Sequence, residues 1–157
     1  MSQRGPPGAY IEHCRAMLAG FTLAVEFRNR PWFEGDRHTR RTLDFERDNG
    51  LVNVVVDEPR DIANTIPSVW EVTNPDLALL RLHGRNHDAW NRKGLTASSQ
   101  RFNYDYSEGE LQGLIPHVTS LARKAKQVHV LFNTNYRDQG QRAARAMTRL
   151  LGIVTPD

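Results

Sequence analysis

The sequence contains little of what secreted, redox-active or membrane proteins need. Cysteine occurs once, at Cys14, which excludes an internal disulfide and a zinc site made of several thiolates. No stretch of about 18 consecutive residues is apolar, and the first seven residues lack the apolar segment of a secretory signal. We therefore expect a cytoplasmic protein with no membrane partner, in which Cys14 is a small buried apolar side chain.

Lysine is also scarce, because the 157 residues contain 3 lysines and 18 arginines. The formal net charge is only +3, but the charge is unevenly distributed. Residues 1–78 carry 9 basic and 12 acidic side chains, whereas residues 79–157 carry 12 basic and 6 acidic ones. The second half is therefore the part expected to face anions, and a nucleic-acid or nucleotide-binding module is one alternative for the function.

Short apolar runs alternate along the chain with segments of helical periodicity. The runs typical of β-strands are residues 21–28, 51–57, 78–83 and 127–133. The predicted helices cover residues 9–19, 36–48, 107–125 and 138–151, the third of them opened by a capping box at Ser107 and Glu110. Residues 58–75 are poorly patterned, and residues 84–105 form a long connection without a clear helix. This alternation predicts an α/β fold with a parallel sheet.

Within each predicted strand, every second residue is apolar and is expected to face the helices. The other rows become polar toward the carboxyl end of each strand. They comprise Ala24, Glu26 and Arg28; Asn53, Val55 and Asp57; Leu79, Arg81 and His83; and His129, Leu131 and Asn133. Such a row is costly to bury under a second helix layer, but it suits the mouth of a TIM-type (β/α) barrel. Because a full barrel has eight strands, about four strand–helix units predict a half barrel.

The predicted half barrel occupies residues 9–152, between flexible tails at residues 1–8 and 153–157. The strands at residues 21–28 and 127–133 would be left as open edges with unpaired backbone groups. Such a chain is expected to need a partner, either a second copy in a homodimer or a separately encoded N-terminal half. The alternative is an inactive fragment.

Four motifs in order along the chain carry a family resemblance. They are the residues at 25–33 (VEFRNRPWF), at 81–85 (RLHGR) followed by Trp90, at 101–107 (RFNYDYS) and at 132–135 (FNTN). Over residues 9–152 the chain resembles the YecE-like family, domain of unknown function 72. The resemblance implies a TIM barrel of about eight strands, of which this sequence matches the C-terminal half, as in a truncated member. It implies no reaction, because the activity of that family is not established.

The polar strand ends predict one site at the barrel mouth. Carboxylates and imidazoles there can be tuned for proton transfer, and the acid/base candidates are Glu26, Asp57 and His83. The candidate ligands for an anion are Arg28, Arg81, Arg85 and Asn133. One hypothesis is an enzyme that acts on a small anionic or sugar-like substrate. The other is an ion-pair network that fills the barrel without any chemistry.

The long connection at residues 84–105 supplies aromatic rings near the same site. Trp90, Tyr104 and Tyr106 are candidates for stacking on bases or sugars, or they anchor the connection to the barrel rim. We predict no metal site, because two arginines in the polar rows would repel a divalent cation. The sequence has neither a Gly-rich phosphate loop nor a serine nucleophile motif, and it identifies no cofactor.

Overall fold

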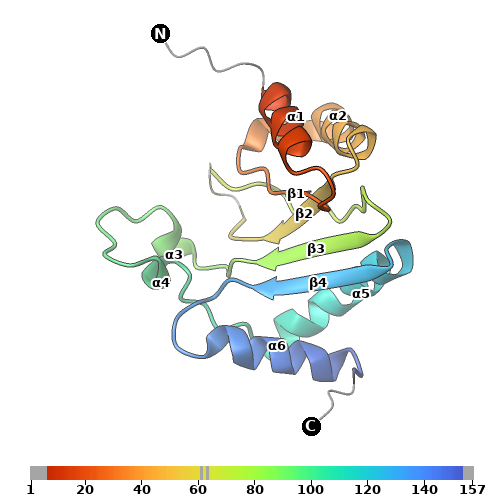
Figure 1. Cartoon of the computed structure of the whole chain (residues 1–157). Helices are drawn as coiled ribbons and strands as arrows, with labels where there is room; N and C mark the ends of the chain where they lie inside the picture. The colour runs from red at the N-terminus through yellow and green to blue at the C-terminus, as the bar shows by residue number, and fades with distance from the viewer. Residues whose placement is uncertain (1–6, 61, 63, 154–157) are drawn as a thin grey trace.

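The centre of the molecule is a four-stranded parallel sheet (Figure 1). The computed structural model describes residues 7–60, 62 and 64–153. The strands are β1 (Ala24–Val25), β2 (Val52–Asp57), β3 (Leu77–Leu82) and β4 (Gln127–Phe132), and they lie in the order β1-β2-β3-β4. Each strand is parallel to the one before it. The order does not reverse within the sheet, as it would at the switch point of a doubly wound fold.

The four long helices expected from the sequence are present. They are α1 (Pro7–Met17), α2 (Gly35–Asp48), α5 (Glu108–Lys124) and α6 (Gln139–Leu150). Helix α5 begins with the predicted capping box, since the Ser107 side chain accepts from the Glu110 N–H and the Glu110 side chain accepts from the Ser107 N–H. No helix in the described part of the chain combines the length and apolar character that crossing a membrane requires.

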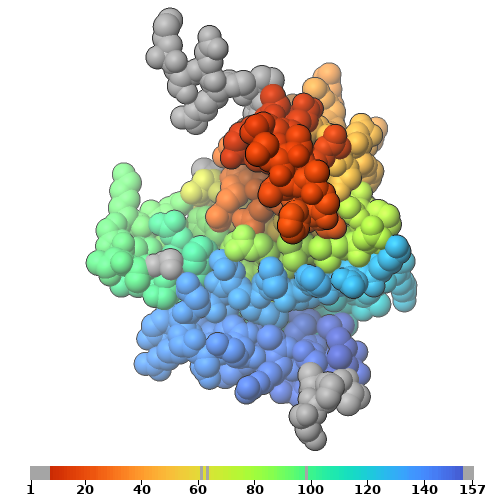
Figure 2. Space-filling view, in the orientation of Figure 1, coloured from red at the N-terminus to blue at the C-terminus, as the bar shows by residue number. Residues whose placement is uncertain are grey.

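Short helical turns complete the structure and correct one prediction. They are η1 (Arg30–Phe33), α3 (His87–Trp90) and α4 (Ser98–Arg101). The last two lie in the connection at 84–105, which we expected to lack helices and which projects from one side of the molecule (green, Figure 2). Helix α3 is a single turn, capped by the Asn86 side chain accepting from the Ala89 N–H. One turn is too short to show the periodicity of a helix in the sequence.

The ends of the chain also differ from the prediction. Pro7 and Gly8 already belong to α1, although a tail was predicted over residues 1–8. Residues 1–6, and 154–157 of the predicted C-terminal tail, lie outside the described residues. Cys14 on α1 is half-buried rather than buried. Strand β1 is much shorter than the predicted strand at 21–28, and Phe21 is 75% exposed.

The main core lies between the sheet and helices α5 and α6. Leu80 and Leu82 of β3 are fully buried there. The helices contribute Leu111, Leu114, Val118, Leu121, Ala143 and Met147. Burying one such leucine stabilises the fold by about 1.5–3 kcal/mol, so this packing fixes which face of β3 meets the helices. Arg81 and His83 therefore point to the opposite face, which we call the open face.

The orientation of β2 was predicted wrongly. In register, Val55 pairs with Leu80 and Asp57 with Leu82, so these two β2 residues face the helices. Val56 pairs with Arg81 and faces the open face instead. All six residues of β2 are buried, and a strand buried on both faces has no polar–apolar alternation from which its orientation can be read.

Candidate functional site

A charged cluster on the open face is built around Glu26, which directly follows β1. We call Glu26, Arg28, Arg81, His83 and Asn133 the Glu26 cluster. Glu26 Oε1 lies 3.3 Å from Arg28 Nε and 3.3 Å from His83 Nε2, and Arg81 donates to Oε2. The Glu26 side chain is only 12% exposed. Strand parity predicted that these five residues lie on one face, and their contacts place them together.

The surroundings of Glu26 fix its charge. Burial raises the pKa of this carboxyl, but the neighbouring His83 and Arg81 outweigh burial and lower it to about 2. The carboxylate therefore stays ionised at any pH where proteins normally work. Glu26 is therefore an anion in contact with Arg28 and Arg81.

His83 is held between protein groups rather than presented to a ligand. Its side chain is 1% exposed, and its Nδ1 lies 3.0 Å from the Asn133 side-chain nitrogen. The rings of Trp90 and Phe102 pack against the imidazole with centroids 6.4 and 5.9 Å away. Nδ1 lies against Asn133, whereas the buried Nε2, 3.3 Å from Glu26 Oε1, has no hydrogen-bond partner among the described residues.

Asp57 and Arg85 do not join the Glu26 cluster, which corrects the prediction of a single site. Arg85 Nε lies 2.9 Å from Asp57 Oδ2 and Arg85 Nη2 lies 2.8 Å from Oδ1. The Tyr106 hydroxyl donates to Oδ2 at 2.7 Å and accepts from the Gly84 N–H at 3.0 Å. These groups share the face of Leu82, because Asp57 is its register partner. Asp57, Arg85 and Tyr106 therefore bond to one another on this face, apart from the Glu26 cluster.

This Asp57 network extends to Tyr104 and Glu110. Arg85 Nη1 lies 3.3 Å from Glu110 Oε1, and the Tyr104 hydroxyl donates to the same oxygen. Burial and the neighbouring Glu110 raise the pKa of Tyr104 to about 12. Burial, with the neighbouring Asp57, raises the pKa of Tyr106 further. Both phenols therefore remain protonated donors that tie the connection at 84–105 to β2 and α5.

The aromatic residues predicted to stack on a ligand are mostly packed inside the protein. Trp90 and Tyr106 are each 6% exposed, and Tyr104 is half-buried with its ring centroid 5.0 Å from that of Tyr106. Stacking on nucleic-acid bases needs exposed rings. The geometry of these three residues matches the alternative interpretation, in which they anchor the long connection.

Sequence reasoning missed one carboxyl near the Glu26 cluster. Glu58 is 8% exposed, and its Oε1 accepts from the Ile66 N–H at 2.6 Å. Burial raises the pKa of Glu58, although the Ile66 N–H and the charge of His83 oppose this. Glu58 comes two residues after Val56, so the observed orientation of β2 puts it in the row of Arg81. Glu58 would have been identified as a candidate if β2 had been assigned the orientation in which Val56 pairs with Arg81.

The described residues include no group of three or more His, Cys, Asp or Glu side chains placed to hold a metal ion. The cationic side chains nearest to Glu26 are two arginines, which compete with any cation for its carboxylate. The chemistry available in the Glu26 cluster is therefore the recognition of anions by guanidinium groups.

Comparisons with known proteins agree with this fold. Residues 2–156 match the family described as "Protein of unknown function DUF72". The chain is 33% identical over 147 residues to the UPF0759 protein YunF of Bacillus subtilis (strain 168), a match that covers 92% of this chain and 52% of that protein. The chain thus spans about half the length of the curated relative that it matches.

Solved structures give the same result. A DUF72 family protein (EF0366) from Enterococcus faecalis V583 superposes with a TM-score of 0.87 at 31% identity, over 96% of this chain and 54% of that one. A DUF72 family protein (TM1631) from Thermotoga maritima MSB8 gives a TM-score of 0.79 at 34% identity, over 92% of this chain and 51% of that one. The family predicted from the sequence motifs is confirmed, and the chain belongs to the DUF72 family.

Proposed function

We propose that residues 9–152 form the C-terminal half of a TIM-type barrel, with the open face as part of its interior. Three observations support this. The strands follow one another in order and in parallel, as they do around a barrel, and the chain spans about half the length of its relatives. On β4 the row facing away from α5 and α6 is exposed, including Leu131 at 47%. A second copy or a separate N-terminal half would cover that row.

Within this architecture, we propose that the Glu26 cluster binds a small anionic or sugar-like substrate. The observation that carries this proposal is that Arg28 and Arg81 share the single carboxylate of Glu26. The two guanidinium groups carry one more positive charge than Glu26 neutralises. The Arg28 side chain is 57% exposed and the Arg81 side chain 31%. An anionic substrate supplies the missing negative charge and accepts paired hydrogen bonds from the guanidinium groups.

Two carboxyls with opposite pKa shifts supply the acid/base part of the proposal. Glu26 stays ionised, whereas burial makes Glu58 easier to protonate. Pairs of this kind mark acid and base roles in enzymes. We assign proton donation to Glu58, anion binding to Arg28 and Arg81, and positioning to His83 and Asn133.

Replacing Arg81 with Gln is expected to weaken binding of inorganic phosphate to the Glu26 cluster by roughly 10-fold, because a charge-assisted hydrogen bond is lost. Nuclear magnetic resonance follows this binding through the side-chain amide of Asn133, which contacts His83. Arg145→Gln is the matched control, because Arg145 is an exposed arginine on α6. An Asn133 signal that does not move with phosphate, or that moves equally in Arg81→Gln, would contradict anion binding at this site.

The nucleic-acid hypothesis stays a prediction with less support. Several basic side chains of the second half are paired with carboxylates, including Arg85 with Asp57 and Arg142 with Asp105. These pairs reduce the positive charge available to a phosphate backbone. The buried rings of the connection at 84–105 likewise offer little surface to bases.

A further inference from the structure

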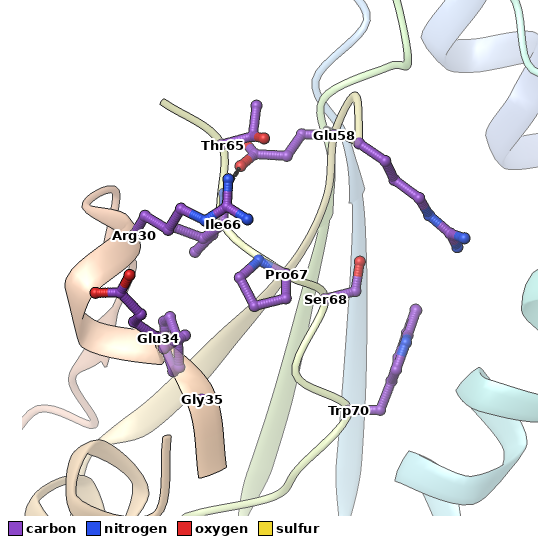
Figure 3. Close-up of a pocket in the computed structure, with 11 residues that line it drawn as sticks. Arg30, Glu34, Gly35, Glu58, Thr65, Ile66, Pro67, Ser68 and Trp70 are labelled. Atoms are coloured by element: carbon purple, nitrogen blue, oxygen red, sulfur yellow. Dashed lines mark hydrogen bonds between the residues drawn. The ribbon is translucent and has the colours of Figure 1, made fainter. Parts of the chain in front are cut away.

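A separate cavity lies at the carboxyl ends of β1 and β2. Its volume is about 440 Å³, within the range of small-molecule sites. Residues around η1 and the start of α2 form one side, and the segment that follows β2 forms the other (Figure 3). None of the five residues of the Glu26 cluster lines it, and Glu58 lies between the two. Ligands of parallel α/β sheets commonly bind at this end of the strands.

Two arginines with unused hydrogen-bonding capacity line this cavity. Arg30 on η1 and Arg60 after β2 make no ion pair or side-chain hydrogen bond with any described residue. In Figure 3 the Arg30 side chain extends from η1 toward Ile66, across the cavity. Arg28 and Arg85, by contrast, are paired with carboxylates. The charge of Arg30 and Arg60 is therefore available to an anion that enters the cavity.

The lining also contains two carboxyl groups. Glu34 is exposed at the start of α2, and Glu58 is buried, with Oε1 accepting from the Ile66 N–H. Only Oε1 of Glu58 has a hydrogen-bond partner among the described residues, so Oε2 is left for a ligand hydroxyl. The cavity thus contains guanidinium groups that can bind an oxyanion and a carboxyl group that can accept a hydrogen bond from a hydroxyl group.

An aromatic wall closes the cavity near α5. Trp70 stacks on His117 of α5, with ring centroids 4.3 Å apart and planes inclined by 15°. This contact holds the plane of the indole ring. Phe33, Ile66 and Pro67 add apolar lining. A held aromatic ring beside a few polar groups is the composition of sites that bind small molecules containing a ring.

The segment that forms one wall is held by several contacts, although the described residues of 58–75 include no helix or strand. The Asn53 side chain donates to the carbonyl oxygens of Val69 and Glu71, at 3.1 and 3.2 Å. Nearer the cavity, the Thr65 hydroxyl donates to the Ile62 carbonyl at 2.8 Å. These bonds preorganise the wall, which lowers the entropic cost of binding.

We propose that this cavity is a second binding site, which binds a small molecule that contains a ring and carries an oxyanion group. Arg30 and Arg60 bind the oxyanion, Trp70 contacts the ring, and Glu58 accepts a hydrogen bond from a hydroxyl group. Sugar phosphates and nucleoside monophosphates share this chemistry. The proposal goes beyond anion binding at the Glu26 cluster: the two sites use different arginines, and Glu58 is the residue that both involve.

The test is a titration of the 157-residue chain with three probes: inorganic phosphate, ribose 5-phosphate and adenosine 5′-monophosphate. The readout is the indole N–H signal of Trp70, assigned from its loss in Trp70→Phe. We expect at least one ring-bearing probe to shift this signal and to bind more tightly than inorganic phosphate. Binding of both ring-bearing probes identifies the sugar phosphate as the recognised part. Binding of the nucleotide alone identifies contact between the base and Trp70.

Matched variants separate this site from others. Arg30→Gln and Arg60→Gln are each expected to weaken binding by roughly 10-fold, since each removes a charge-assisted hydrogen bond from an exposed side chain. Arg145→Gln on α6 and Arg81→Gln in the Glu26 cluster are expected to leave binding at Trp70 unchanged. The proposal is overturned if no probe shifts the Trp70 signal, or if Arg145→Gln or Arg81→Gln weakens binding as much as Arg30→Gln.

Discussion

Replacing Asp57 with Asn lowers the free energy of unfolding by about 3 kcal/mol, because it breaks a buried ion pair while leaving the cation in place. The Asp57 side chain is 4% exposed and accepts from both Arg85 and Tyr106. Asparagine presents a single carbonyl oxygen to these donors and carries no charge. The guanidinium of Arg85, only 27% exposed, then lacks its principal partner.

Urea-induced unfolding measures this loss, with Asp105→Asn as the matched control. Asp105 pairs with Arg142 at 2.8 Å, but the two side chains are 49% and 53% exposed. An exposed pair contributes about 1 kcal/mol or less, so the control is expected to change stability little. Equal effects of Asp57→Asn and Asp105→Asn would contradict the structural role assigned to the Asp57 network.

Replacing Glu46 with Gln is expected to stabilise the protein near neutral pH. Glu46 on α2 is 0% exposed, and neither carboxyl oxygen has a hydrogen-bond partner among the described residues. Burial raises the pKa of Glu46 to about 8, with the charge of Arg47 acting in the opposite direction. The folded protein therefore keeps the proton on Glu46 at a pH where the unfolded chain has released it.

The raised pKa of Glu46 determines whether Glu46→Gln stabilises the protein and over which pH range. Below the ordinary pKa of 4.5 both states are protonated, and Glu46 costs no stability through its ionisation. Between pH 4.5 and 8 the unfolded chain ionises at Glu46 while the folded protein keeps the proton, which favours unfolding. This lowers the free energy of unfolding by roughly 3 kcal/mol at pH 7. Glutamine does not ionise, so Glu46→Gln removes this cost.

Unfolding in urea at pH 4, 5.5, 7 and 8 tests the effect of Glu46. The stability gained by Glu46→Gln should be near zero at pH 4 and should increase up to pH 8. Glu12→Gln is the control, because Glu12 is exposed on α1. A gain that does not depend on pH would mean that the pKa of Glu46 is not raised in the folded state, and a gain that Glu12→Gln reproduces would mean that the burial of Glu46 is not its cause.

The sequence predicted those parts of the fold in which one face is polar and the other apolar. In β3 the apolar residues Leu80 and Leu82 alternate with Arg81 and His83, so the parity of this strand was correct. The same alternation grouped Arg81 and His83 with Glu26. The Ser107 capping box gave the start of α5, because both of its hydrogen bonds are local.

Features that depend on tertiary contacts were not predictable in the same way. The six residues of β2 are all buried, and the orientation of this strand is set by its pairing with β3. The error moved Asp57 into the candidate site and left Glu58 out. The burial of His83 depends in part on Trp90 and Phe102, which come from a connection whose path had no periodicity to reveal it.

We propose that the open face is the interior of a half barrel that needs a partner. Light scattering after size exclusion, combined with a thermal melt of the 157-residue chain, tests it directly. We predict that the chain alone is no stable monomer. A discrete dimer would support a second copy as the partner, and aggregation without a cooperative transition would support the need for a separate half. A monomer that unfolds cooperatively at micromolar concentration would contradict the claim.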